Sequence, residues 1–238
     1  MPLVTIAWQY GSLGDEIGQD VAQKLGVRYV DREIINAVAL RMGTPEQVVA
    51  DIEDKSPSFA KRVADAVIQA FADGSRLAPL TGVVPPPILS PTGEALAEDD
   101  EPQVFTFDVN DGVYLNFVRQ VVRDIAAAGD AVIAGRATHL LLHDVASALH
   151  VHVVAPFEVR VERIMEERAC SREAADKLAR DADHARESYT SRFYHSRWSD
   201  PTQYHLTLNT GLLTAAEARD LIISAAGQIR RAPGSVPA

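Results

Sequence analysis

The residues best suited to chemistry in this sequence lie in one short turn, Tyr10–Gly14, which has glycines at Gly11 and Gly14. The segment before the turn, residues 3–6, is short, apolar and rich in β-branched side chains, which predicts a strand. Residues 14–25 after it have apolar side chains at helical spacing. A strand that enters a helix through a glycine turn aims free backbone N–H groups, and the positive end of the helix dipole, at one point. Such a point binds an anion, and in this architecture the usual anion is a nucleotide phosphate.

The charged positions of the turn differ from those of the phosphate-binding P-loop, G-x-x-x-x-G-K-[ST]. If Gly14 is aligned with the second glycine of that motif, Gln9 occupies the position of the first glycine. Asp15 then replaces the lysine, and Glu16 replaces the serine or threonine. Two interpretations stay open. The turn binds phosphate through its backbone, or the two acids only complement the dipole of a helix that binds nothing.

Two further polar residues directly follow predicted strands. Asp31 comes after the extended run 27–30, and Arg136 follows Gly135 at the end of the apolar run 131–134. Open α/β sheets bind ligands at the carboxyl ends of their strands, so both side chains are expected at the edge that the glycine turn faces. The alternatives are structural: Asp31 as the N-cap of the next helix, and Arg136 as the partner of a nearby carboxylate.

Arginines recur in two charged segments late in the chain, a predicted helix over 157–169 and another from Ser171 onward. Most of these charges are expected on a solvated face. A mobile pair of arginine-bearing helices is also how a kinase lid closes over a transferring phosphate. The second helix carries Arg180 and Arg186.

Strands and helices alternate along the chain, which predicts an α/β fold: a parallel sheet of about five strands with helices on both faces. The last two strands are expected in residues 150–156 and 204–210, and further helices in the segments 31–43, 45–72, 114–128, 139–142 and 214–230. Residues 1–231 are expected to form a single domain. The tail 232–238 is expected to be disordered.

An inserted segment interrupts this pattern at about residues 74–108, where six prolines and an acidic run leave no helical period. It is expected to be a functional cover, an oligomerisation arm that forms a homodimer, or a disordered loop. The sequence does not choose among the three.

Composition excludes several classes of protein. The net charge of −10 argues against a general nucleic-acid binder. No apolar run approaches a membrane span and the N-terminus lacks a signal peptide, which favours a cytoplasmic protein with no membrane partner. The single cysteine, Cys170, expected in an exposed helix, excludes an internal disulfide and a cysteine-based metal site. His139 and His143 have helical metal-ligand spacing but lack the accompanying glutamate, so no metal site is predicted.

Taken together, these blocks resemble the cytidylate kinase-like family. The similarity runs from YGSLGDEIGQDVAQKLGVRYVDREII through AVIAGRATHLLL and APFEVRVERI to RWSDPTQYHLTLNTGLLT, and includes a D-x-x-R-x-x-Y pattern that begins at Asp183. The blocks lie in order along nearly the whole chain, the proline-rich segment excepted. The sequence differs from the family pattern at Trp8, where arginine is usual, and at Leu13, where glycine is usual.

The resemblance implies a P-loop NTPase fold of the nucleoside monophosphate kinase type, with an arginine-bearing helical lid. It implies ATP and Mg²⁺ as cofactors, small-molecule nucleotides as partners, and phosphoryl transfer to a CMP-like or dCMP-like acceptor. It also implies site residues. Phosphate or nucleotide binding is expected from Gly11, Ser12, Leu13, Gly14, Asp15, Glu16, Arg160 and Arg163, acceptor binding from Asp31, Arg32 and Arg136, and a catalytic role from Arg136, Arg180 and Arg186.

Two functions follow from these residues. In the first, the protein is a nucleotide kinase whose backbone amides and lid arginines replace the P-loop lysine, since neutralising charge is most of the catalysis in phosphoryl transfer. In the second, it is a nucleotide-sensing or interaction module that keeps the fold without the chemistry. The second function is based on Trp8, Asp15 and Glu16.

Overall fold

The computed structural model describes residues 2–31, 33–46, 49 and 111–229. Several predictions fall outside this range and stay predictions: Arg32, most of the helices expected in 45–72, the proline-rich segment 74–108 and the tail 232–238.

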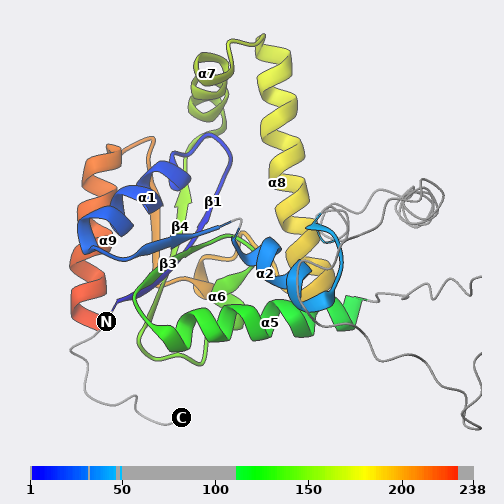
Figure 1. Cartoon of the computed structure of the whole chain (residues 1–238). Helices are drawn as coiled ribbons and strands as arrows, with labels where there is room; N and C mark the ends of the chain where they lie inside the picture. Colours follow the sequence, from blue (N-terminus) through cyan, green and yellow to red (C-terminus); the bar gives the residue numbers. More distant parts are fainter. Residues whose placement is uncertain (1, 32, 47–48, 50–110, 230–238) are drawn as a thin grey trace, which may run out of the picture. The chain divides into compact units, whose positions relative to one another are not determined.

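The described chain is built on one parallel sheet of five strands, as the sequence predicted (Figure 1). The strand order is β2-β3-β1-β4-β5, so β1 lies at the centre, with β3 on one side and β4 on the other. The first strand is central because the chain goes first to β2 and β3 on one side and then crosses to β4 and β5. The strands are β1 (Leu3–Trp8), β2 (Arg28–Val30), β3 (Ala131–Ala134), β4 (Ala148–Val154) and β5 (Leu206–Asn209).

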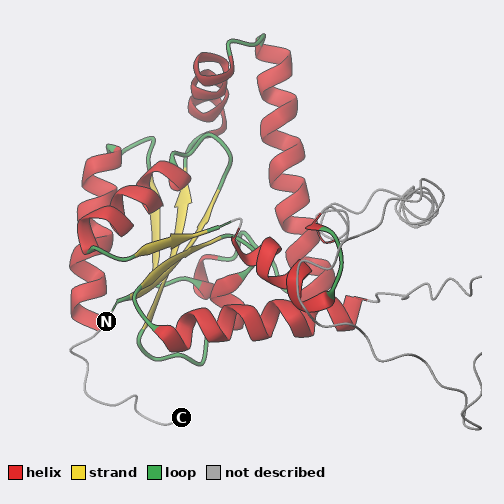
Figure 2. Ribbon diagram, viewed as in Figure 1, coloured by secondary structure: helices red, strands yellow, loops and turns green. Residues whose placement is uncertain are grey.

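Helices lie on both faces of the sheet (Figure 2). Their bounds agree with the sequence pattern to within a few residues, and a short 3₁₀ helix, Pro201–Gln203, precedes β5. One expectation was wrong: Cys170 lies in the connection between two helices, half-buried, and not within a helix. The helices are α1 (Gly14–Leu25), α2 (Glu33–Met42), α5 (Asp111–Ala128), α6 (Thr138–Leu141), α7 (Phe157–Arg168), α8 (Arg172–Tyr194) and α9 (Ala215–Ile229).

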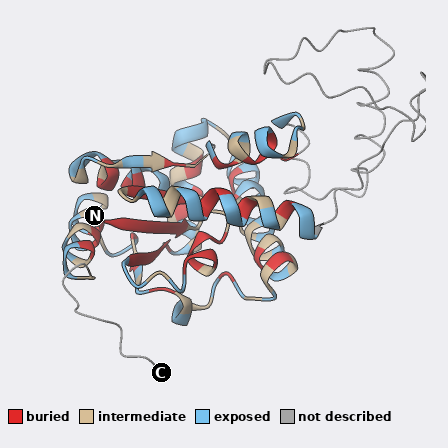
Figure 3. Cartoon of the chain, turned by 60° about the horizontal axis from the view of Figure 1, so that its bottom comes forward, coloured by how far each residue is buried: buried red, intermediate tan, exposed pale blue. Residues whose placement is uncertain are grey.

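The alternating residues of β4 divide the core into two layers. Leu149, Val151 and Val153 pack with α1 and α9 in a purely apolar cluster. By the alternation of a strand, His150 and His152 lie on the opposite face, near His139 of α6. Figure 3 shows the central strands buried, with α5 in front of them exposing one side to solvent.

On this side of the sheet, β4 packs against an aromatic and polar cluster. The His152 ring stacks on Tyr204 at 4.7 Å and meets Trp198 edge-on at 5.0 Å. The His139 ring lies 4.4 Å from Tyr204, and its Nε2 is 3.3 Å from Gln203 Oε1. Burial lowers the pKa of His139 to about 3 and that of His152 to about 4. Both rings are therefore neutral structural groups at neutral pH.

The predicted pair of charged helices is present as α7 and α8, which pack against each other through Val161, Ile164, Ala175 and Ala179. In Figure 1 they stand beyond the carboxyl end of β1. Ser171 caps α8, since its side chain accepts a hydrogen bond from the amide of Ala174. Motion of this pair as a lid remains a prediction.

Candidate functional site

Two adjoining cavities lie at the carboxyl edge of the sheet. The first, of about 590 Å³, is bounded by the glycine turn and by residues of α7. The second, of about 510 Å³, is bounded by the ends of β1 and β3 and by α8. Trp8, Asp31 and Arg186 line both cavities, so the two spaces meet at these side chains.

The glycine turn presents unpartnered backbone donors to the first cavity. The amide of Ser12 donates to the Gln9 carbonyl, and that of Ile17 donates to the Leu13 carbonyl. Between them lie the four amides of residues 13–16, for which the described part of the chain supplies no hydrogen-bond acceptor. These four residues all line the cavity, as does Gly11. Amides at the start of a helix, next to the positive end of its dipole, form an anion-binding site.

Close packing determines the shape of the turn. Gly11 has φ +81°, and a Cβ there would lie 2.8 Å from the carbonyl oxygen of Arg160. A Cβ on Gly14 would lie 2.2 Å from the Cβ of Trp8. The end of β1 therefore lies directly against the first turn of α1, which leaves room for no side chain.

We expect Gly14→Ala to lower the free energy of unfolding by about 1–3 kcal/mol, because the new methyl group would displace Trp8 in a packed position. Urea denaturation measures this change. The matched control is Gly227→Ala on α9, where a Cβ meets no atom within 4 Å. That variant is expected to be about 0.5–1 kcal/mol more stable than the wild type, since alanine is the better helix former. Equal stability of Gly14→Ala and wild type would contradict the packing described.

Two residues predicted in the phosphate loop have side chains that hydrogen-bond away from the cavity. The Ser12 hydroxyl is fully buried and donates to the carbonyl of Val153 at 3.1 Å. The Asp15 carboxylate accepts hydrogen bonds from Tyr29 Oη and, at 3.1 Å, from Gln19 Nε2. The turn thus offers a bound anion its backbone, and Ser12 serves to hold the turn onto β4.

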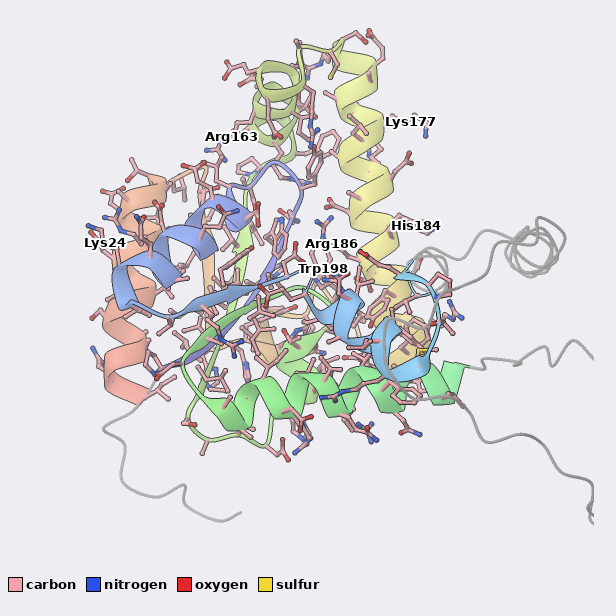
Figure 4. The ribbon with its side chains drawn as sticks, viewed as in Figure 1. Lys24, Arg163, Lys177, His184, Arg186 and Trp198 are labelled. Carbon is pink, nitrogen blue, oxygen red and sulfur yellow. The ribbon has the colours of Figure 1, made fainter. Side chains whose placement is uncertain are left out.

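Arg186 lies at the junction of the two cavities. Its guanidinium carbon is 5.4 Å from the centroid of the Trp8 ring, and its Nη1 donates to the Ala182 carbonyl. Within the described ranges, it forms no ion pair with a carboxylate. Burial lowers the pKa of Arg186 below the ordinary arginine value, because loss of water disfavours the charged form. In Figure 4 its side chain leaves α8 toward the sheet, whereas Lys177 and His184 leave the same helix on the other side.

The predicted acceptor residues Asp31 and Arg136 are brought together in the second cavity. Arg136 Nη1 lies 2.8 Å from the Asp31 carboxylate and 3.2 Å from its carbonyl oxygen. The structural alternative for Arg136 is thus observed, and the same pair lines the cavity. The lining also includes the aromatic residues Trp8, Tyr189 and Trp198 and four alanines.

The remaining predicted arginines play different parts. Arg160 is buried; it donates to the carbonyls of Ala155 and Tyr10 and pairs with Asp183 at 2.8 Å. It therefore connects the turn to α8.

Arg163 lines the first cavity and donates to Gly11 and to both oxygens of Thr210. Arg180 is exposed, pairs with Asp176 and lies over the Phe157 ring at 4.3 Å. It lines neither cavity.

The lining of the first cavity has more carboxylates than guanidinium groups. The carboxylates are Asp15, Glu16, Asp31, Glu166 and Glu167; the guanidinium groups are Arg163, Arg168 and Arg186. A polyphosphate bound there would need further positive charge, which a divalent cation supplies. In the described residues, no three His, Cys, Asp or Glu side chains are grouped to bind a metal ion by themselves. His143 instead contacts the Leu140 carbonyl through Nδ1.

The sheet order, the glycine turn before α1 and the two cavities define a P-loop kinase fold. The chain belongs to the cytidylate kinase-like family, whose model matches residues 3–212. Membership of this family and the fold together support a nucleotide-binding, kinase-like function.

Comparison with known proteins gives one partial sequence match and several structural ones. The uronate isomerase of Corynebacterium glutamicum is 34% identical over 107 residues, which cover 44% of this chain and 21% of that protein. The match therefore spans about a fifth of the relative's length.

An uncharacterized protein from Eubacterium ventriosum ATCC 27560 shares the fold, with a TM-score of 0.59 at 14% identity over 95% of this chain and 99% of that one. The structural match to a gluconokinase from Sinorhizobium meliloti 1021 covers 97% of this chain and 94% of the gluconokinase chain, with a TM-score of 0.44 and 11% identity. Among the helices that the structure describes, none combines the length and apolarity needed to cross a bilayer.

Proposed function

We propose that this protein transfers a phosphoryl group from ATP, bound with Mg²⁺ over the glycine turn, to a nucleoside monophosphate of the CMP or dCMP type. The observation that carries the proposal is the position of Arg186. It is a guanidinium group without an ion pair in the described structure, and it lies where the two cavities meet. Donor and acceptor phosphates of a transfer reaction must also meet at one point.

The roles of the residues follow from their positions. The free amides of residues 13–16 would bind phosphate oxygens of the donor, assisted by the positive end of the α1 dipole. Arg186 would stabilise the negative charge on the transferring group, which a preorganised cation in a partly desolvated site does well. Mg²⁺ would neutralise the donor phosphates against the acidic lining.

The second cavity fits a planar acceptor with a charged end. Its aromatic walls, Trp8 and Trp198, suit a nucleobase, which stacks on aromatic rings. Arg136 would contact the acceptor or its phosphate, and Asp31 would orient the guanidinium through their ion pair. A phosphate bound to Arg136 and the carboxylate of Asp31 would then both accept hydrogen bonds from the same guanidinium group.

Turnover assays test the proposal directly. The purified protein is incubated with MgATP and, separately, with CMP, dCMP, UMP and AMP, and nucleoside diphosphate is measured. We expect turnover with at least one pyrimidine acceptor. Absence of product with every acceptor would overturn the proposal.

Arg136→Ala is expected to raise the KM for the acceptor by about 10- to 100-fold, the usual loss when a charge-assisted hydrogen bond is removed. Steady-state kinetics with varied acceptor measure this change. Arg123→Ala is the matched control, since Arg123 pairs with Asp144 outside both cavities. An unchanged KM in Arg136→Ala would remove Arg136 from the acceptor site.

The acidic lining of the first cavity favours a second function, a nucleotide-sensing module without turnover. The carboxylate at Asp15, where a P-loop has its lysine, lowers the positive charge available to the transition state. Calorimetry separates the two functions: nucleotide binding without product formation would support the sensor, and binding with product formation would exclude it.

A further inference from the structure

The carboxylate of Asp15 has two hydrogen-bond donors that belong to neither cavity. Oδ1 accepts from the Tyr29 hydroxyl, and Oδ2 accepts from Gln19 Nε2 at 3.1 Å. Tyr29 and Gln19 are both absent from the cavity linings, whereas Asp15 is part of the first. Both carboxylate oxygens are therefore bonded to groups outside the cavity.

Local packing makes this arrangement possible. Tyr29 lies on β2 opposite Val132, and its ring crosses α1 at Gly18, where a Cβ would come within 2.8 Å of Tyr29 Cε2. Only the missing side chain at Gly18 lets the ring lie this close to the helix. Gln19 is one helical turn after Asp15, the spacing at which side chains on a helix meet. Burial and the bond to Asp15 raise the pKa of Tyr29, so its hydroxyl remains a donor at neutral pH.

The position of this carboxylate affects anion binding because its own backbone amide is one of the four free donors of the turn. A carboxylate that rotated toward those amides would repel a bound phosphate and compete for the same N–H groups. Two unit charges about 4 Å apart repel by about 1 kcal/mol even in bulk water, and by more in a partly buried cavity.

We infer that Tyr29 and Gln19 are positioning residues that hold the Asp15 carboxylate away from the free amides, so that the turn binds phosphate although its lysine is replaced by an acid. This inference depends on the proposed function, since it assigns the way in which the same turn binds the donor nucleotide. Neither residue contacts the nucleotide; both act through Asp15.

A double-mutant cycle tests the inference. Calorimetry measures the affinity for MgATP of the wild type, Tyr29→Phe, Asp15→Asn and the double variant. We expect Tyr29→Phe to bind about tenfold more weakly, and Gln19→Leu to be weakened in the same direction. Asp15→Asn is expected to bind at least as tightly as the wild type. In the Asp15→Asn background, Tyr29→Phe is expected to have no further effect, because no charge remains to be held.

The cycle separates positioning from a general structural role. A structural defect in Tyr29→Phe would weaken binding in both backgrounds, and thermal unfolding shows whether each variant is folded. The loss in Tyr29→Phe should also shrink as KCl is added, since salt screens the repulsion.

Equal MgATP affinity in the wild type and Tyr29→Phe, or a loss that persists with Asn at position 15, would overturn the inference and leave the proposed function intact. If the folded wild type and Asp15→Asn both fail to bind MgATP, the proposed function and the inference are both overturned.

Discussion

Replacing Arg186 by methionine is expected to lower the rate of phosphoryl transfer by about 10³-fold or more, which is the effect of removing an arginine that stabilises the transferring group. The position of the side chain is the reason. It lies at the meeting point of the two cavities, over the Trp8 ring, and has no competing ion pair among the described residues. Its charge is thus available to a ligand.

The same variant should keep its stability. Burial of the guanidinium group lowers its pKa, so the buried cation is a cost to the folded state. This cost is offset in part by the hydrogen bond to the Ala182 carbonyl, the contact with the Trp8 ring and the charges of nearby acids. Methionine fills similar volume and packs well on an aromatic ring. We therefore expect the free energy of unfolding to change by less than about 1 kcal/mol. Loss of activity without loss of stability would identify a residue kept for function.

Initial-rate kinetics and urea denaturation on the same preparations measure both effects. Lys177→Met is the matched control, since it removes one positive charge from α8 on the side that faces away from the sheet (Figure 4). Arg186→Lys should restore part of the rate, because a lysine keeps the charge without the planar fork. A rate for Arg186→Met within tenfold of wild type would contradict the assigned role.

Acidification from pH 7 to pH 5 is expected to lower the free energy of unfolding by about 5–6 kcal/mol through three buried histidines. Burial lowers the pKa of His139 to about 3, and those of His150 and His152 to about 4. A nearby His205 also lowers the pKa of His150, and the charge of Arg186 that of His152. In the unfolded chain these rings take up protons near pH 6.5.

The sign follows from this difference. Above about pH 6.5 neither state binds these protons, so the full stability is present. Between pH 6.5 and pH 4 the unfolded state alone takes them up, and each histidine lowers stability by about 1.4 kcal/mol per pH unit. Because domains have only about 5–15 kcal/mol of stability, the fold should be close to unfolding at pH 5.

Urea denaturation at pH 7, 6 and 5 measures this slope. His139→Gln should lower it by about one third, since one of the three rings is removed. A change of less than 1 kcal/mol between pH 7 and pH 5 would show that the rings are protonated in the folded protein, contrary to their burial.

Most of the fold could be predicted from the sequence because its signals are local. Apolar runs of four to seven residues and helical periodicity each depend on neighbours in the chain, and they located the strands and helices to within a few residues. Parallel strands put their carboxyl ends at one edge, so Asp31 and Arg136 were expected near the glycine turn, and the structure brings them to the adjoining cavity.

The parts of the candidate site that escaped prediction depend on contacts between distant residues. A catalytic role was expected of both Arg180 and Arg186, yet six residues of helix turn one about 120° from the other, and only Arg186 lines the cavities. Trp8 was noticed only as a departure from the family pattern. The part played by Tyr29 had no sequence signal, since its partner Asp15 lies fourteen residues earlier.

The sequence by itself determined the class of this protein: a parallel α/β domain with a glycine turn before its first helix and polar residues after its strands, because these patterns repeat over short distances. Only the tertiary structure decided which charged groups are available to a ligand. Arg160 and Asp15 are held by partners from other elements, and Arg186 faces the cavities without an ion pair among the described residues. Whether a charge is paired depends on side chains that only folding brings within a few ångströms of it.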